Sequence, residues 1–132
     1  MNQIQPAQIV PFLKRFQFQG GSLRRLRIRN NSRQSSSGEL IVSVREANGK
    51  KVRLRIVLDG VEEYRFQRRP GPGLFRLKEV RIGVFDGLIY FNLDAYIDEA
   101  PALHDFRASD AFIAGRSIAW EIIPPTPKPS SA

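Results

Sequence analysis

The sequence predicts an all-β fold: an antiparallel meander that forms a sandwich or a partly open barrel, with one short N-terminal helix. Apolar and polar residues alternate over several short segments, which is typical of half-buried strands. Two strong hairpin signals, Asn48-Gly49 and Asp59-Gly60, join consecutive segments of this kind. No long helical pattern separates the segments, which favours antiparallel sheets over an α/β arrangement.

The N-terminal segment carries apolar residues at helical spacing. Ile9, Phe12, Leu13 and Phe16 would share one face of a short helix. Pro11 removes a hydrogen-bond donor and disfavours helical geometry at the residue before it. An irregular apolar segment is therefore the alternative at this position.

Strand patterns follow along most of the remaining chain. Residues 30–38 are polar and Ser-rich and are expected to form a loop, whereas residues 88–93 are nearly all apolar and predict a strand covered on both faces. In the segment before that strand, Val80, Ile82 and Val84 are expected to point inward. The predicted strands are residues 23–29, 39–46, 51–58, 61–68, 76–85, 88–93 and 117–123.

The register of the first hairpin follows from its side chains. A two-residue loop would set Val44 opposite Arg53 and mix apolar with charged side chains on one face. A three-residue loop over residues 47–49, with Gly49 in the left-handed conformation, sets Val44 opposite Val52 instead. We therefore expect the three-residue loop.

The same rule predicts a three-residue loop over residues 58–60 at the second turn. The two hairpins would then continue as one meander, in which Tyr64 and Phe66 point inward and Arg53 lies opposite Arg65. Like charges in that position are mildly destabilising, and an acidic ligand would relieve them.

The positive charge of the chain is concentrated in its first half. The 132 residues hold 21 Lys and Arg against 13 Asp and Glu, a formal net charge of +8. The second half is neutral, so the excess lies on the alternating strands and predicts a charged surface. The candidate partner-binding residues are the outward arginines of these strands, Arg25, Arg27, Arg29, Arg53, Arg55, Arg65 and Arg81.

An acidic protein partner is the favoured ligand of this arginine surface. Nucleic acid, bound through phosphate contacts, is the alternative. Sheets that bind single strands usually add exposed aromatic residues for base stacking, and the outward positions between the arginines hold none. A solvated face without a ligand also fits the pattern. A homodimer, held together by apolar surface that the fold leaves exposed, is a further alternative.

The residue inventory argues against catalysis, cofactors and metals. Cysteine is absent, which excludes disulfides and thiolate sites, and a single histidine cannot build a His-rich metal cage. Residues 94–110 predict an acidic loop with a turn of helix, in which His104 and Asp105 precede Ser109 without the GxSxG turn that presents a nucleophile. We therefore expect no enzyme, no cofactor and no metal site.

The chain is expected to form one domain over residues 1–123, followed by a disordered Pro-rich tail over residues 124–132. No apolar run approaches the length of about 18 residues that a membrane span requires. The N-terminus has no basic cluster ahead of an apolar core, unlike a signal peptide. These features predict a cytoplasmic protein without membrane contact.

Three stretches carry a family resemblance: FQFQGG at residues 16–21, VRLRIVLDGVEEYRF at 52–66 and DFRASDAF at 105–112. With these stretches in this order, the chain resembles small β-rich immunity proteins of bacterial polymorphic toxin systems and similar bacterial domains. The resemblance implies a non-enzymatic protein that binds and blocks a toxin. Many such proteins are acidic, as suits basic nuclease toxins, whereas this basic chain would require an acidic toxin surface.

Overall fold

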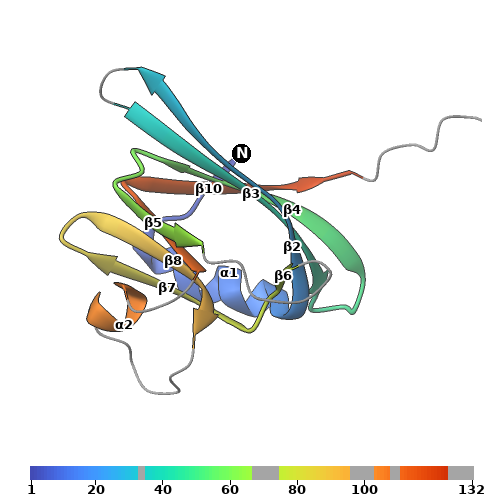
Figure 1. Cartoon of the computed structure of the whole chain (residues 1–132). Helices are drawn as coiled ribbons and strands as arrows, with labels where there is room; N and C mark the ends of the chain where they lie inside the picture. The colour runs from blue at the N-terminus through green and yellow to red at the C-terminus, as the bar shows by residue number, and fades with distance from the viewer. Residues whose placement is uncertain (33–34, 67–74, 96–102, 108–110, 125–132) are drawn as a thin grey trace, which may run out of the picture.

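Two antiparallel sheets packed face to face make up the molecule, which confirms the predicted all-β class (Figure 1). The computed structural model describes residues 1–32, 35–66, 75–95, 103–107 and 111–124. The two sheets do not close into a barrel and lie as the layers of a sandwich. Of the tail predicted over residues 124–132, only Pro124 is described, and residues 125–132 lie outside the described part.

The larger sheet has six strands in the order β1-β10-β4-β3-β2-β6. Its central strands β4, β3 and β2 follow one another as an antiparallel meander, and β10 adds to β4 from the far end of the chain. The strands are β1 (Asn2–Gln3), β2 (Phe16–Ser32), β3 (Ser35–Glu46), β4 (Lys51–Asp59), β6 (Phe75–Arg76) and β10 (Ser117–Ile123).

The smaller sheet has four strands in the order β5-β9-β8-β7. Strand β8 is covered on both faces, as its apolar sequence predicts, because Ile89 and Phe91 point into the sandwich while Tyr90 lies under helix α2. The strands are β5 (Glu63–Phe66), β7 (Glu79–Phe85), β8 (Leu88–Ala95) and β9 (Ala111–Gly115).

Short helices complete the fold. After the 3₁₀ turn η1 (Pro6–Gln8), helix α1 (Ile9–Arg15) forms despite its proline, because Pro11 occupies the first turn, where its missing N–H has no intrahelical partner. The helical alternative for this segment is therefore correct. Helix α2 (Leu103–Arg107) supplies the predicted helical turn in the acidic segment and packs its Phe106 on the outer side of the small sheet.

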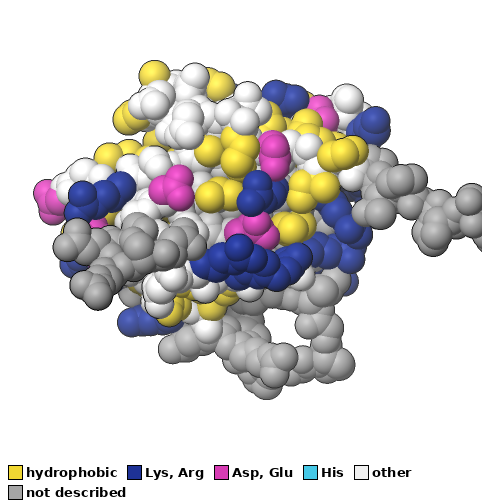
Figure 2. Space-filling model, turned by 90° about the horizontal axis from the view of Figure 1, so that it is seen from above, with side chains coloured by type: hydrophobic (Ala, Val, Ile, Leu, Met, Phe, Trp, Pro, Cys, Tyr) yellow, Lys and Arg dark blue, Asp and Glu magenta, His cyan; other side chains and the backbone are white. Residues whose placement is uncertain are grey.

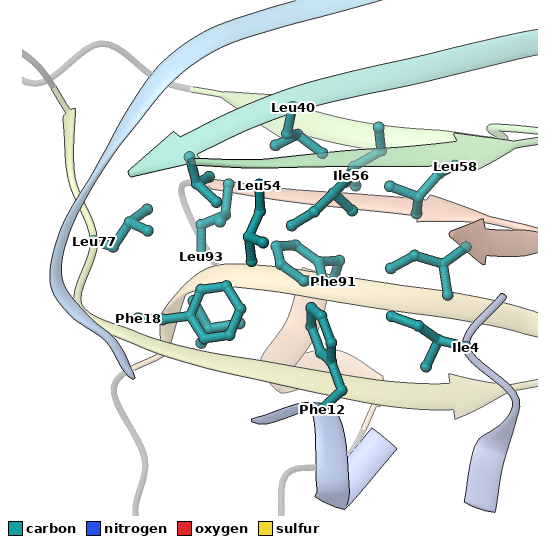
Figure 3. Close-up of a cluster of buried hydrophobic side chains, with 14 of the residues drawn as sticks. Ile4, Phe12, Phe18, Leu40, Leu54, Ile56, Leu58, Leu77, Phe91 and Leu93 are labelled. Atoms are coloured by element: carbon teal, nitrogen blue, oxygen red, sulfur yellow. The ribbon is translucent and has the colours of Figure 1, made fainter. Parts of the chain in front are cut away.

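The main core lies between the two sheets and is closed at one end by α1 (Figure 3). Leu54 and Ile56 of β4 face Phe91 of β8, while Phe12 of α1 reaches in between the layers. These side chains are almost completely buried. Burial on this scale is the main stabilising contribution to a domain of this size.

The first hairpin has the predicted register. Val44 pairs with Val52, and the N–H of Glu46 donates to the carbonyl of Lys50 across a three-residue loop. Gly49 holds the left-handed conformation, with φ of +87°, at the last loop position. This geometry matches a bulged three-residue hairpin turn.

The second predicted hairpin is wrong. Strand β4 pairs with β3 and β10, while β5 joins β9 in the other sheet, so Arg53 does not lie opposite Arg65. The chain crosses between the sheets after Gly60, where Val61 turns into the core. Strand β10 displaces the expected partner because its apolar side chains pair with β4 over its whole length.

Three further expectations need correction. The segment 76–85 is two strands, β6 and β7, and Val84 near the end of β7 is 42% exposed rather than inside. Tyr64 is 56% exposed because β5 is an edge strand, while Phe66 of the same strand packs against the core. In the Ser-rich segment, residues 30–32 belong to β2 and residues 35–38 to β3 rather than to a loop, while residues 33 and 34 lie outside the described part.

Candidate functional site

The outer face of the six-stranded sheet is the candidate binding surface. Register places alternate residues of β2, β3, β4 and β10 on this face, away from the core. Figure 2 looks onto it from above and shows Lys and Arg side chains gathered along one side, with acidic and apolar side chains among them. Its basic residues are Arg25, Arg27, Arg29, Arg45, Lys51, Arg53 and Arg55, and its acidic residues are Glu39, Asp59 and Glu121.

Arg55 lies near the centre of this face and is held by two carboxylates. Its Nε donates to Oε2 of Glu39 at 2.7 Å, and its Nη1 donates to Oε1 of Glu121 at 3.2 Å. These hydrogen bonds, the one to Glu39 first, raise the pKa of the Arg55 guanidinium above its ordinary value. The cluster fixes the side chain across three strands.

Other arginines of the face differ from Arg55 in having no such partner. Arg25, Arg29 and Arg53 are exposed, and within the described residues none of them makes an ion pair or a side-chain hydrogen bond. Arg27 is half-buried beside them on β2, opposite Glu39 of β3. The face therefore carries Arg55, which is held by two ion pairs, together with three exposed arginines that have no such partner.

Two of the seven predicted site residues lie elsewhere. Arg65 on β5 and Arg81 on β7 belong to the four-stranded sheet, on its outer face. Arg65 donates through Nη1 to the carbonyl of Arg107 at 3.1 Å, and Arg81 pairs with Glu79 at 3.2 Å. The structure thus brings together Arg25, Arg27, Arg29, Arg53 and Arg55 and separates the other two from them.

A polar cluster on the four-stranded sheet joins helix α2 to strands β5 and β8. Arg107 of α2 donates to both carboxylate oxygens of Glu63, from Nε at 2.9 Å and from Nη2 at 3.0 Å. The Tyr90 hydroxyl also donates to Glu63. These bonds, the Arg107 pair first, lower the pKa of Glu63, while burial and the bond to Glu63 raise the pKa of Tyr90. Because Arg107 and Tyr90 both donate to the Glu63 carboxylate, this cluster has a structural role and links α2 to β5 and β8.

Some basic residues of the outer face were missed by the sequence interpretation. Arg45 and Lys51 face each other beside the first hairpin, and the predicted register of that hairpin already placed both on the outward phase. Arg24 carried no such signal, because it lies at a register shift between Leu23 and Arg25. The bulge turns its side chain out of the alternation that the sequence suggests.

In comparisons with known proteins, no family model, no curated protein and no solved structure matches the chain. In the described residues no group of three or more His, Asp and Glu is placed to hold a metal ion. No helix in that part of the chain is long and apolar enough to cross a membrane. The side chains of His104 and Asp105, and the whole of Ser109, lie outside the described part.

Proposed function

We propose that this protein is a non-enzymatic interaction module of the cytoplasm that binds an acidic protein surface through the outer face of its six-stranded sheet. An immunity-type inhibitor, which blocks a toxin by covering it, would work in this way. The proposal concerns the five arginines that share the face, Arg25, Arg27, Arg29, Arg53 and Arg55.

The observation that carries the proposal is the exposure of Arg25, Arg29 and Arg53 without an acidic partner in the described chain. Surface arginines can remain solvated. In the strand register no basic residue lies opposite any of these three, and none of them has an acidic partner in the described chain. Carboxylates of a partner could therefore pair with their guanidinium groups and accept bidentate hydrogen bonds from them. Arginine is also among the residues enriched at the centres of protein interfaces.

The pattern of the face favours a protein over nucleic acid. Glu39 and Glu121 lie in its middle, where a phosphate backbone would be repelled but a partner's lysine or arginine would be attracted. Ile41 and Val57 lie between the charges and supply partly exposed apolar surface. None of the described residues on this face is aromatic, so base stacking has no platform here.

The test is a charge reversal on the face with a matched reversal elsewhere. The variant is Arg25→Glu/Arg29→Glu, and its control is Lys14→Glu/Arg116→Glu, which changes the net charge equally on exposed residues of α1 and of the β9–β10 turn. Proteins that cross-link to each variant and to wild type are identified. Each candidate partner is then purified and its Kd is measured directly over a salt series.

The expected result is an acidic partner whose affinity falls at least tenfold, or about 1.4 kcal/mol, in the Arg25/Arg29 variant and stays within about twofold in the control. Two outcomes would overturn the proposal. In the first, no purified partner distinguishes the two variants. In the second, duplex DNA or RNA binds with a steep salt dependence that the face variant abolishes, which would establish phosphate binding instead.

A further inference from the structure

A break in the hydrogen-bonding between β2 and β3 creates an opening next to the basic outer face. Gln17 pairs with Arg45, but the next pair along the strands is Ser22 with Ser43. Residues 18–21 of β2 therefore lie opposite a single residue of β3, Val44. A bulge of this size bends the strand and opens the ladder at that point; Figure 1 shows β2 curving sharply from α1 up into the sheet.

The looped-out segment is fixed in place by the backbone. The N–H of Gly20 donates to the carbonyl of Leu77, and the N–H of Leu77 donates to the carbonyl of Gly21. A Cβ on Gly21 would lie 2.4 Å from the carbonyl oxygen of Ser43, so the close approach of the two strands requires glycine. Backbone hydrogen bonds and the close approach at Gly21 therefore fix the shape of this opening.

This opening is a hollow of about 330 Å³ lined by donors of hydrogen bonds. Arg24, the bulge residue, joins Arg45 and Lys51 around it, and the described residues that line it include no carboxylate. The Nη1 of Arg45 donates to the carbonyl of Gly49 at 3.0 Å, which holds that side chain at the rim. Neutral polar side chains complete the lining: Gln17, Gln19, Ser22 and Ser43.

We propose that this hollow binds the oligophosphate group of a small phosphorylated molecule. Three cations, together with the amide and hydroxyl side chains of the lining, match an anion with several charges and many acceptor oxygens. A singly charged anion would leave most of these donors unused. The β-bulge opens the ladder at this point and so leaves room for such an anion beside the cations.

A groove of about 720 Å³ continues from the hollow and shares Arg24, Ser43 and Lys51 with it. It adds the cations Lys50 and Arg53, and one carboxylate, Glu46. Its apolar side is formed by Val52, Ile122 and Ile123. The organic part of the ligand would lie on this apolar side while the phosphates occupy the hollow, an arrangement typical of pockets with a few charged anchors.

The experiment titrates the whole protein with sodium tripolyphosphate and follows backbone amide shifts by NMR and heat by calorimetry. Wild type is compared with Arg24→Gln/Lys51→Gln and with the charge-matched control Lys14→Gln/Arg116→Gln. Thermal melts check that both variants are folded. Orthophosphate is titrated as the minimal probe, and a single-stranded oligonucleotide as the polymer.

We expect one saturable site, with shifts centred on residues 17–24 and 43–51. The Arg24/Lys51 variant should bind tripolyphosphate at least tenfold more weakly, the control should stay within twofold, and orthophosphate should bind more weakly than tripolyphosphate. Several weak sites, or equal losses in both variants, would show diffuse attraction and overturn the proposal. Tight binding of the oligonucleotide alone would overturn it as well. Since Arg25 and Arg29 are unchanged here, failure of this site leaves the proposed function untouched.

Discussion

Phe12 closes the open end of the sandwich, and its truncation gives the sharpest test of the packing. The side chain is 4% exposed, although it belongs to a helix of only seven residues. Its ring lies 5.6 Å from the rings of Phe16 and Phe18 and 5.5 Å from that of Trp120, measured between centroids. Phe12→Ala therefore removes the central member of an aromatic cluster.

The cost of this change follows from burial and from the cavity left behind. Truncation of a buried phenylalanine typically costs about 3–5 kcal/mol, and well-placed aromatic pairs add about 0.5–1.5 kcal/mol beyond buried area. We expect about 4–5 kcal/mol here, because three rings lose a neighbour between two layers that cannot close the gap. At about 3–5 °C per kcal/mol for a domain of this size, Tm should fall by about 15 °C.

Urea unfolding, followed by the fluorescence of Trp120 and by far-UV circular dichroism, measures the loss. Val10→Ala is the matched control, because Val10 lies on the same helix and is 58% exposed; it should change stability by less than about 0.5 kcal/mol. Phe12→Leu should lose about 1.5 kcal/mol and keeps the test valid if the alanine variant does not fold. The reasoning is refuted if Phe12→Ala loses less than about 1 kcal/mol and behaves like Val10→Ala.

Three other predictions follow from local geometry. Arg107 and Tyr90 lower the pKa of Glu63 below 4.5. The stability that this carboxylate contributes is therefore present above pH 4.5 and is lost as the pH falls through the pKa of the folded state. In urea unfolding between pH 7 and pH 3, Glu63→Gln should reduce this loss of stability by up to about 1 kcal/mol. Gly49→Val should cost about 1–2 kcal/mol in thermal unfolding, because φ at this turn is +87°, and an unchanged Tm would contradict the left-handed turn. Gly115→Val should cost about 1–3 kcal/mol, because a Cβ there would lie 2.8 Å from a carbonyl oxygen of β4; unaltered amide exchange in β9 would count against this contact.

The features that sequence predicted correctly have local causes. The first hairpin depends on one glycine and on matching side chains within nine positions, Val44 to Val52, so its register follows from the local sequence. Helix α1 depends on apolar spacing that Pro11 does not disturb when it lies in the first turn. In both cases the deciding contacts lie within one segment of chain.

The features that sequence missed depend on distant partners. Strand β9 was not expected because all five of its residues are buried, which removes the alternation that reveals a strand, and two are alanines. The second hairpin failed because β10, about sixty residues further along, offers Ile118, Trp120 and Ile122 to the core phase of β4. No property of the Asp59-Gly60 turn itself shows this competition.

The candidate binding surface illustrates the same division between local and distant causes. The phase of each arginine along its strand was correct for Arg53 and Arg55, because it follows from alternation alone. Alternation does not determine which sheet a strand joins, and strand pairing places Arg65 and Arg81 on the other side of the sandwich. The other five predicted arginines stay together on the face, where Arg45 and Lys51 of the first hairpin add to the positive charge. A sequence can thus predict that a charged face exists while misplacing part of its membership, because charge and phase are local and strand pairing is not.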